Sequence, residues 1–323
     1  MAERIAIIGA GVSGLTCGVL FAEHGYHTAI FAKKIGQETT SGAAAALWFP
    51  YHVEPAHRVI PLALQTFDAL ADLARVPMSG VSMIELHQFS RTGEIPIPDW
   101  AIPLGARPSP LSVIPSEVEG SLEIFKSGFS LHVPLMDTTI YLDYLIARFR
   151  KAGGEINADV HFEQLENVDN QFELVTNCTG IGARELAQDF DLEPHRGQVA
   201  IVPTIEGLSC AIVCDDAPLM YAIPRTNDCV FGGTNEISDN LAADPATTSQ
   251  IVAECTRTLD IDKPPVLVER VGLRPFRKSG VRLERDRLPD GRTVIHNYGH
   301  GGAGFTLSWG CAREVLDMAV SSR

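Results

Sequence analysis

A glycine pattern directly after the first apolar segment constrains the fold of this chain more than any other feature. Residues 4–8 form a short apolar run, as expected of a strand buried on both faces of a parallel sheet. Apolar residues at helical spacing occupy residues 15–24, and a second apolar segment at residues 28–32 completes a strand–helix–strand unit. Between the first strand and the helix the spacing is Gly-x-Gly-x-x-Gly, with glycines at Gly9, Gly11 and Gly14. This context is typical of a loop that binds a dinucleotide.

Each glycine of this loop has a physical role. We expect Gly9 to allow the tight turn, Gly11 to let the backbone approach a pyrophosphate, and Gly14 to let the helix pack closely on the strand. The helix N-terminus adds free N–H groups and the positive end of the helix dipole, which attract phosphate. The predicted phosphate-binding loop comprises Gly9, Ala10, Gly11, Val12, Ser13 and Gly14.

The position that usually binds the adenosine ribose departs from this pattern. A Rossmann-type site has Asp or Glu about 20 residues further on, whereas this chain has Lys33 and Lys34 in that region. The two lysines are compatible with a 2′-phosphate, as in NADP, and equally with solvated side chains beside an FAD held by backbone contacts. The loop alone therefore predicts a dinucleotide without deciding which one.

The rest of the chain predicts an α/β protein whose nucleotide-binding unit is interrupted by β-rich segments. We expect further helices at residues 62–73, 137–151, 245–259 and 309–320, and strands at residues 172–178, 267–272 and 294–298. Proline-rich extended segments and short strands separate them. The predicted fold is a Rossmann-type domain of residues 1–51, 134–186 and 266–323, with a discontinuous, β-rich α+β domain of residues 52–133 and 187–265.

Composition and charge exclude two classes of partner. The formal net charge is −14, whereas binding to a nucleic-acid backbone needs clustered Lys and Arg, so we expect no nucleic-acid partner. No stretch reaches the ~18 uninterrupted apolar residues that span a bilayer. No secretory signal follows Met1, so we expect neither export nor membrane insertion.

The seven cysteines are scattered and odd in number, which is typical of reduced thiols rather than of a disulfide framework. Cys210 and Cys214 are close in sequence, but no second Cys or His pair with zinc-ligand spacing follows, so we expect no metal site. These features favour a cytoplasmic protein. The oligomeric state is left open, and a homodimer is compatible with the sequence.

Several separated segments resemble those of the D-amino acid oxidase family. They are residues 39–51, 177–180, 196–198, 272–277, 281–285, 296–306 and 309–312. The resemblance spans nearly the whole chain and is more specific than the glycine loop. It implies FAD as the cofactor, a Rossmann-type FAD-binding domain and a second, substrate-binding domain.

The resemblance also implies which residues contact the flavin. Small residues at 42–46 let the backbone lie close to the ring, and Leu47 supplies an apolar wall. The glycine cluster at residues 301–304 admits the same approach, and its N–H groups stabilise negative charge at the N1–C2=O edge, which Thr306 is expected to hydrogen-bond. Beyond the phosphate loop, the expected FAD-binding residues are Lys33, Lys34, Thr39, Thr40, Ser41, Ala45, Ala46, Leu47, Phe162, Thr179, Gly180, Gly301, Gly304, Phe305 and Thr306.

The substrate site implied by the resemblance centres on Arg274. A guanidinium matches a carboxylate bidentately, which would orient the α-carbon of an amino acid over flavin N5. Tyr221 resembles the family tyrosine whose hydroxyl binds the same carboxylate. The other residues expected in the catalytic pocket are Phe49, Tyr51 and Gly302.

The implied reaction is the oxidative deamination of a D-amino acid. Hydride passes from the α-carbon to flavin N5 while the amine is neutral, so no side-chain base is required and His300 is expected to be structural. The iminium product is hydrolysed to a 2-oxo acid and ammonia, and O2 is reduced to H2O2.

Two alternatives remain open. The first is a related flavoenzyme that oxidises D-aspartate, glycine or secondary amines, or that uses an acceptor other than O2. The second is a flavin- or NADP-binding protein without oxidase activity. Asp215 and Asp216 lie near the presumed entrance, where a D-aspartate enzyme needs cations, so we expect a preference for neutral or basic D-amino acids. Vertebrate oxidases of the family that the chain resembles carry a tyrosine on an active-site lid. The corresponding residues 215–220 lack that tyrosine, so we expect an open site.

Overall fold

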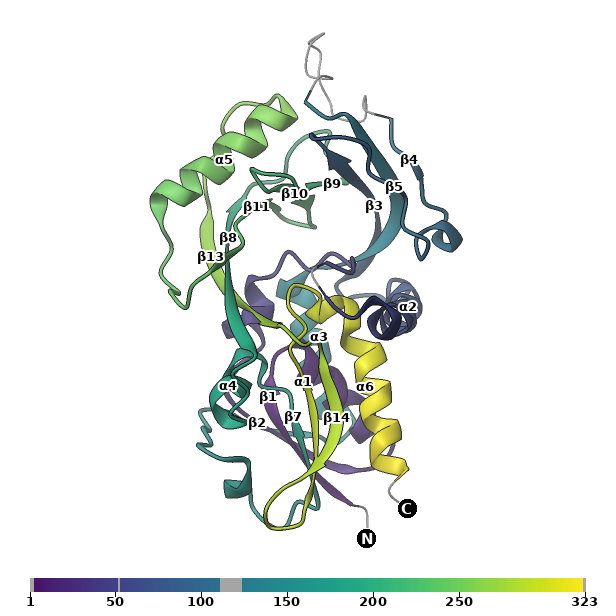
Figure 1. The fold of residues 1–323 in the computed structure, drawn as a ribbon, viewed down its shortest axis with the longest axis vertical. Coiled ribbons are helices and arrows are strands. Elements are labelled where there is room, and N and C mark those ends of the chain that lie inside the picture. The colour runs from purple at the N-terminus through teal and green to yellow at the C-terminus, as the bar shows by residue number, and fades with distance from the viewer. Residues whose placement is uncertain (1–2, 52, 111–123, 322–323) are drawn as a thin grey trace.

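The computed structural model describes residues 3–51, 53–110 and 124–321, and in this part of the chain it contains two β-sheets in one elongated body (Figure 1). The parts of the predicted domains at residues 1–2, 52, 111–123 and 322–323 lie outside the described residues.

The first sheet is the parallel sheet predicted around the glycine loop. Its strands lie in the order β14 (Arg282–Arg287), β15 (Thr293–Tyr298), β7 (Leu174–Asn177), β1 (Arg4–Ala10), β2 (His27–Ile35) and β6 (Glu155–Asn157). β1 pairs in parallel with β2 and β7, and β14 runs antiparallel to β15 at the edge. The strands predicted at residues 4–8, 28–32, 172–178 and 294–298 are confirmed, with shifted ends.

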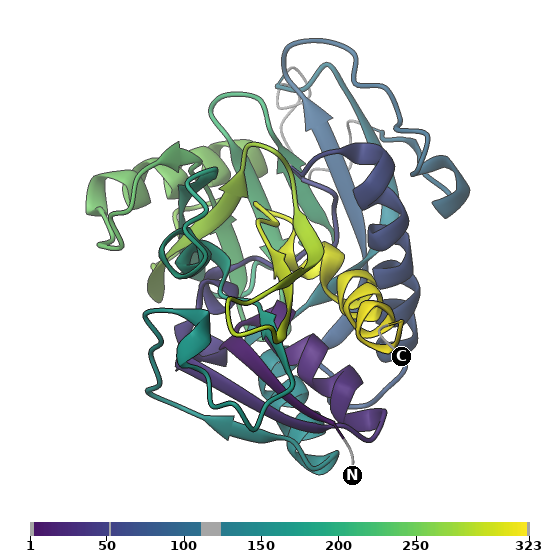
Figure 2. The same cartoon turned by 60° about the horizontal axis from the view of Figure 1, so that its bottom comes forward.

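Helices α1 (Val12–Glu23), α3 (Thr138–Lys151) and α6 (Gly304–Val320) pack beside this sheet (Figures 1 and 2). Asp137 caps α3, because its carboxylate accepts the N–H of Thr139 at 3.0 Å. The predicted start of the last helix at residue 309 is wrong, since α6 begins at Gly304. Burial of Phe305 and Leu307 outweighs the low helix propensity of the glycines around them.

Helix α2 (Ala56–Leu73) crosses α6 closely and begins before residue 62, where the sequence pattern predicts it. The N–H of Gly310 donates to Thr66 Oγ1 at 2.8 Å. A Cβ at position 310 would collide with the backbone of Leu62, so only glycine allows this crossing. The crossing fixes the position of α6, whose first turn lies at the site described below.

The second sheet is mostly antiparallel and arches over the first (Figure 1). Its strands are β12 (Glu236–Ile237), β8 (Leu192–Val202), β11 (Cys229–Gly232), β10 (Met220–Pro224), β9 (Ala211–Cys214), β3 (Val81–Ser90), β5 (Ser127–Met136) and β4 (Arg107–Pro108), and β13 (Val268–Arg277) pairs with β8. The strand predicted at residues 267–272 is confirmed and continues to Arg277. Its pairing with β8 covers ten residue pairs, from Val268 to Arg277.

Helix α5 (Pro245–Leu259) covers the outer face of the second sheet, where it contacts β8, β10 and β11 (Figure 1). Its predicted bounds are confirmed. The carboxylate of Asp244 accepts the N–H groups of Ala246 and Thr247 at 3.2 and 3.1 Å, and Pro245 occupies the first turn. With α5 outside, the inner face of the sheet is turned towards the first sheet.

This arrangement confirms the predicted α/β fold class, with a parallel Rossmann-type sheet and a β-rich part. The division into residues 1–51, 134–186 and 266–323 against residues 52–133 and 187–265 stays a proposal. In the structure β13 joins the second sheet, although the proposed division counts residues 266–323 with the FAD-binding domain.

In the described ranges, no helix combines the length and apolar character that a membrane span requires. The same ranges contain no group of three or more His, Cys, Asp or Glu side chains placed to hold a metal ion. All seven cysteines are free and buried.

Candidate active site

A cavity of about 800 Å³ lies between the two sheets. The β1–α1 loop lines one end, the inner face of the second sheet lines the other, and residues 39–47 and the start of α6 line the middle. The cavity brings together these predicted site residues: Gly9, Ala10, Gly11, Val12, Ser13, Lys33, Lys34, Thr39, Thr40, Ser41, Ala45, Ala46, Leu47, Phe49, Tyr51, Phe162, Thr179, Gly180, Tyr221, Arg274, Gly301, Gly302, Gly304 and Phe305. Gly14 and Thr306 are not among its lining residues.

The β1–α1 loop has no room for side chains at its glycines. Gly9 has φ +109°, and a Cβ there would collide with the carbonyl of Cys178. A Cβ on Gly14 would collide with the carbonyl of Gly9, so Gly14 brings helix and strand together without facing the cavity. Gly11 approaches Ser41, whose Oγ accepts the N–H of Val12 at 3.0 Å. The loop therefore presents bare backbone at a helix N-terminus, as a pyrophosphate requires.

The end of β2 forms the next part of the lining. Lys33 and Lys34 are exposed there, as the sequence pattern places them. Glu38 follows in the next turn and also lines the cavity, a carboxylate that sequence reasoning missed because it lies beyond the usual ribose position. Phe162 packs edge-on against Phe31, with ring centroids 5.8 Å apart, and supplies an aromatic wall.

The small residues at 42–46 lie along the middle of the cavity. Ala46 has φ +57°, a left-handed conformation that costs a non-glycine residue about 1–2 kcal/mol. The backbone holds it in place, since Met136 N–H donates to the Ala46 carbonyl at 3.0 Å and Trp48 N–H donates to the Pro134 carbonyl at 2.9 Å. The segment is thereby anchored to the end of β5 with its alanines towards the cavity.

The hydroxyl of Thr306, which is expected to hydrogen-bond the flavin, is engaged with the backbone of Phe49. Its Oγ1 donates to the carbonyl of Phe49 at 2.9 Å and accepts the N–H of Phe49 at 3.1 Å. The side chain is 1% exposed. The hydroxyl is thus bound to the Phe49 backbone rather than directed into the cavity, and it joins the start of α6 to the segment after Leu47.

Arg274 and Tyr221 lie together at the far end, over glycines of neighbouring strands. A Cβ on Gly197 of β8 would collide with the Arg274 guanidinium, and a Cβ on Gly232 of β11 would collide with the ring of Tyr221. A Cβ on Gly302 would come within 2.7 Å of the Tyr51 ring. Gly197 and Gly232 were not predicted, because their role depends on strand pairings between segments far apart in the sequence.

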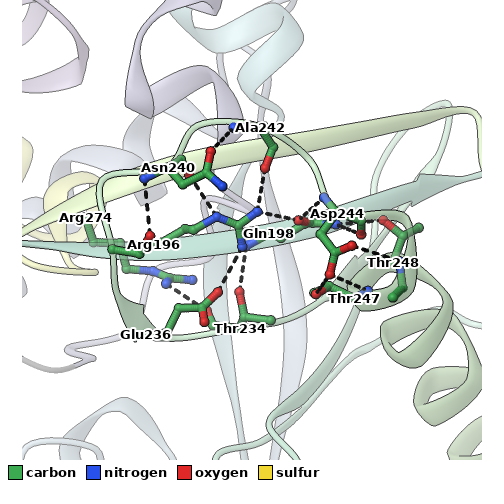
Figure 3. A network of polar contacts seen from close by, with 12 residues as sticks. Arg196, Gln198, Thr234, Glu236, Asn240, Ala242, Asp244, Thr247, Thr248 and Arg274 are labelled. Atoms are coloured by element: carbon green, nitrogen blue, oxygen red, sulfur yellow. Dashed lines mark hydrogen bonds and ion pairs between the residues drawn. The ribbon is translucent and has the colours of Figure 1, made fainter.

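Figure 3 shows a polar network behind Arg274 that fixes the chain from residue 234 to residue 244 on β8. Arg196 is 4% exposed and donates to the carbonyls of Asn240 and Ala242 at 2.8 and 2.7 Å. Its guanidinium also donates to Glu236 at 3.0 Å and to Gln198 at 2.6 Å.

The network reaches Arg274 through Thr234 (Figure 3). The N–H of Gln198 donates to Thr234 Oγ1 at 3.0 Å, which sets the orientation of that residue. The carbonyl of Thr234 in turn accepts Nη1 of Arg274 at 2.9 Å. Arg274 is therefore held at one nitrogen while its side chain lines the cavity.

Burial dominates the ionisation of the polar groups around Arg274. It raises the pKa of Tyr51 to about 12, with a further increase from Asp215 and a decrease from Arg274. Burial likewise raises the pKa of Tyr221, against the effect of Arg274. Nε2 of His300 lies 3.0 Å from Oδ1 of Asn297, and burial lowers the pKa of His300 to about 4. Both phenols and this imidazole are thus neutral near pH 7.

The two carboxylates expected at the entrance have separate places. Asp215 lines the cavity, and burial raises its pKa to about 6. Asp216 is not among the lining residues of the cavity. Its carboxylate accepts hydrogen bonds from the Ser90 hydroxyl at 2.8 Å and from the Arg91 N–H at 2.6 Å. Only residues 215–219 connect β9 to β10, in agreement with the short connection expected from the sequence.

The chain matches the family of FAD dependent oxidoreductases over residues 4–318. It is 37% identical to a D-amino-acid oxidase from Rubrobacter xylanophilus over 324 aligned residues, which cover 98% of this chain and 95% of that protein. The chain belongs to the FAD-dependent oxidoreductase family. A D-aspartate oxidase from Homo sapiens is 32% identical, with 98% of this chain and 94% of that protein covered.

A solved glycine oxidase from Geobacillus kaustophilus has the same fold, with a TM-score of 0.80 at 18% identity and coverage of 99% and 95% of the two chains. The resemblance drawn from the sequence motifs is thereby confirmed at the level of the family. As a member of this FAD-dependent family, the chain has FAD as its cofactor.

The cavity fits FAD. The bare loop of Gly9 and Gly11 suits the pyrophosphate, and the residues after β2 would lie beside the adenosine. β13 packs closely against residues 39–47, since a Cβ on Gly272 would come within 3.1 Å of Ala43, and both residues line the cavity. We keep the individual FAD-binding residues as predictions.

Proposed function

We propose that the chain oxidises D-amino acids, with a preference for neutral or basic side chains, and passes the electrons to O2. The observation that carries the proposal is the placement of Arg274 and Tyr221 at the end of the FAD cavity. The identity of 37% to a D-amino-acid oxidase over nearly the full length supports the same substrate class.

Arg274 would bind the α-carboxylate and thereby orient the substrate. Its Nη1 donates to the Thr234 carbonyl, which fixes the guanidinium beside the cavity that the side chain lines. A bidentate pair between guanidinium and carboxylate adds geometric specificity to its charge. The hydroxyl of Tyr221, neutral because burial raises its pKa, would donate to the same carboxylate. Phe49 and Tyr51 would enclose the rest of the substrate.

No side chain of the pocket is needed as a base, provided that the amine arrives neutral. His300 is engaged with Asn297 and its pKa is about 4, which suits a structural role. The chain would instead accelerate the reaction by holding the α-C–H bond in one direction and by excluding water. When bound, FAD supplies the hydride acceptor and the route to O2, so that the products are a 2-oxo acid, ammonia and H2O2.

We also propose that the protein works in the cytoplasm, which is supported by seven free and buried thiols. The small-molecule substrate and O2 would be its partners, and the sequence is compatible with a homodimer.

A substrate panel with peroxide detection tests the proposed function. Purified holoenzyme is assayed with matched D- and L-amino acids, D-aspartate, glycine and N-methylglycine. We expect H2O2 with neutral and basic D-amino acids and none with their L-enantiomers. The proposal would be contradicted if kcat/KM for D-aspartate, glycine or N-methylglycine were higher than for the neutral and basic D-amino acids. An absence of peroxide with every D-amino acid would also contradict it.

A further inference from the structure

Asp215 is a carboxylate in the substrate half of the cavity that the steps above do not use. It directly follows β9, two residues after Val213, so both side chains lie on the same face of the sheet. Val213 pairs with Gln88 of β3 on one side and with Tyr221 of β10 on the other. Gln88, Val213, Asp215 and Tyr221 all line the cavity. The register therefore places Asp215 on the wall that carries Tyr221.

Gln88 holds the carboxylate of Asp215 without neutralising it. Gln88 is 2% exposed, and its Nε2 donates to Asp215 Oδ2 at 3.1 Å. Among the described residues, no Lys or Arg forms an ion pair with Asp215. Arg91, which directly follows the adjacent strand β3, pairs with Glu254 at 2.6 Å and donates to the carbonyls of Asp216 and Pro218.

The comparison with Asp216 shows that Asp215 is not needed to hold its own connection together. Asp216 fixes the turn at residues 90–92 through several hydrogen bonds and accounts for the architecture there. Asp215 is solvent-accessible and lines the cavity, and partial burial of its carboxylate raises its pKa. A carboxylate that lines the cavity and is held there by a neutral amide is available to a cationic ligand.

Asp215 and Arg274 both lie close enough to Tyr51 to affect its ionisation. Tyr51 responds to both, since Asp215 raises its pKa and Arg274 lowers it. For regular strand spacing, the Cα atoms of Tyr221 and Asp215 are about 8 Å apart. A D-amino acid whose α-carboxylate lies at Arg274 and Tyr221 thus needs a long side chain to reach Asp215, and a cationic end to pair with it.

We propose that Asp215, oriented by Gln88, is the specificity-determining residue that binds the cationic end of long basic D-amino acids such as D-arginine and D-lysine. This inference rests on the proposed function and narrows its substrate class. The bond would be a charge-assisted hydrogen bond inside the cavity, of the kind that distinguishes substrates by about 10- to 100-fold.

Pairs of substrates with the same shape and different charge test this role. D-arginine is compared with D-citrulline, in which a neutral urea replaces the guanidinium, and D-lysine with D-norleucine, which lacks the terminal amine. The kcat/KM ratio within each pair is measured for the wild-type holoenzyme, Asp215→Asn and Asp215→Lys. Asp262→Asn is the matched control, because Asp262 is exposed like Asp215 but does not line the cavity.

We expect Asp215→Asn to lower the D-arginine to D-citrulline ratio by about 10- to 100-fold, and Asp262→Asn to keep the wild-type ratio. Asp215→Lys should raise the ratio of D-glutamate to D-glutamine above that of the wild type, a gain that misfolding cannot produce. An unchanged ratio in Asp215→Asn overturns the inference while D-citrulline oxidation still supports the proposed function. If the wild type oxidises no D-amino acid at all, the proposed function fails first, and this inference falls with it.

Discussion

Arg274 can lie across β8 only because position 197 has no Cβ. Gly197 pairs with Gly272 in the β8–β13 register, two residues before Arg274, and the guanidinium occupies the space that a side chain would fill. On the adjacent strand pair, Gly232 lacks a Cβ and so leaves room for the ring of Tyr221, with which it pairs. At the scale of single residues, the shape of the site thus depends on glycines that leave room for the side chains of Arg274 and Tyr221.

We predict that Gly197→Ala displaces the Arg274 guanidinium and lowers kcat/KM for D-methionine by about 10-fold or more, mainly through a higher KM. FAD content should stay normal, because residue 197 lies at the opposite end from the phosphate loop. Gly93→Ala is the control, since a Cβ at Gly93 meets nothing within 4 Å. Equal kinetics for Gly197→Ala and the wild type would show that Arg274 does not need this space.

A second prediction at this scale concerns pH. Burial raises the pKa of Asp215 to about 6, Gln88 opposes this as a hydrogen-bond donor and Asp216 adds to it. Tyr51, which faces the same space, stays neutral below pH 10 because its own pKa is about 12. Asp215 is therefore charged above pH 6 and neutral below it, so selectivity for a cation should be lost as the pH falls.

The ratio of kcat/KM for D-arginine to that for D-citrulline should decrease as the pH is lowered from 8 to 5, with a midpoint near 6. The ionisation of the α-amine affects both substrates and cancels in the ratio.

Because the pKa of Asp215 is raised in the folded state, its carboxylate also disfavours folding once the pH exceeds the ordinary value near 4. Asp215→Asn should thus be at least as heat-stable as the wild type at pH 8, and a pH-independent ratio would contradict this assignment.

At the scale of elements, the loop from residue 234 to residue 244 is held on β8 by one buried guanidinium. The Arg196 guanidinium donates hydrogen bonds to two carbonyls, a carboxylate and a side-chain amide (Figure 3). A lysine ammonium has only three N–H donors on one atom and cannot bond all four groups together. Because this loop carries the carbonyl that fixes Arg274, we regard Arg196 as a positioning residue rather than a catalytic one.

We predict that Arg196→Lys raises KM for D-methionine by about 10-fold with a smaller change in kcat, while the flavin spectrum of the holoenzyme is unchanged. A purely structural role would lower the melting temperature and the FAD content without this division between KM and kcat. Arg257→Lys is the control, because Arg257 is an exposed arginine on α5 whose ion pair with Glu254 a lysine can also form, and it does not line the cavity.

Local sequence patterns predicted which helices and strands form better than they predicted where these elements end or which elements pack together. The glycine loop and the helical spacing of apolar residues are short-range features, and the structure confirms the helices and the strand that they predict. The start of α6 at Gly304 was missed, because it depends on burial against other elements. The positions of Asp215 beside Gln88 and of Gly197 under Arg274 could not be predicted, since they follow from pairings across a sheet.

At the scale of the whole molecule, the cavity is formed jointly by two sheets, so that cofactor and substrate meet between them. FAD would contact the phosphate loop of the first sheet and the inner face of the second, and neither set of contacts exists in the unfolded chain. FAD binding should therefore stabilise the fold by mass action.

We predict that FAD at 100 times its Kd raises the melting temperature of the apoprotein by about 4 °C, which corresponds to about 2.7 kcal/mol for a chain of this length. Thermal unfolding with and without added FAD measures this shift. Gly11→Val should reduce it, because a side chain at position 11 meets Ser41 and fills the pyrophosphate approach. An identical melting temperature with and without FAD would contradict the assigned cavity.

The measurement that tests the central claim most directly is the anaerobic reduction of bound FAD by D-methionine in Arg274→Ala, followed by the loss of flavin absorbance. We predict normal FAD content and a second-order rate constant at least about 100-fold below that of the wild type, since an unpaired carboxylate no longer fixes the α-carbon. Arg277→Ala, whose guanidinium pairs with Asp189 outside the cavity lining, should reduce FAD much faster than Arg274→Ala. Near-normal reduction in Arg274→Ala would show that another group binds the substrate carboxylate.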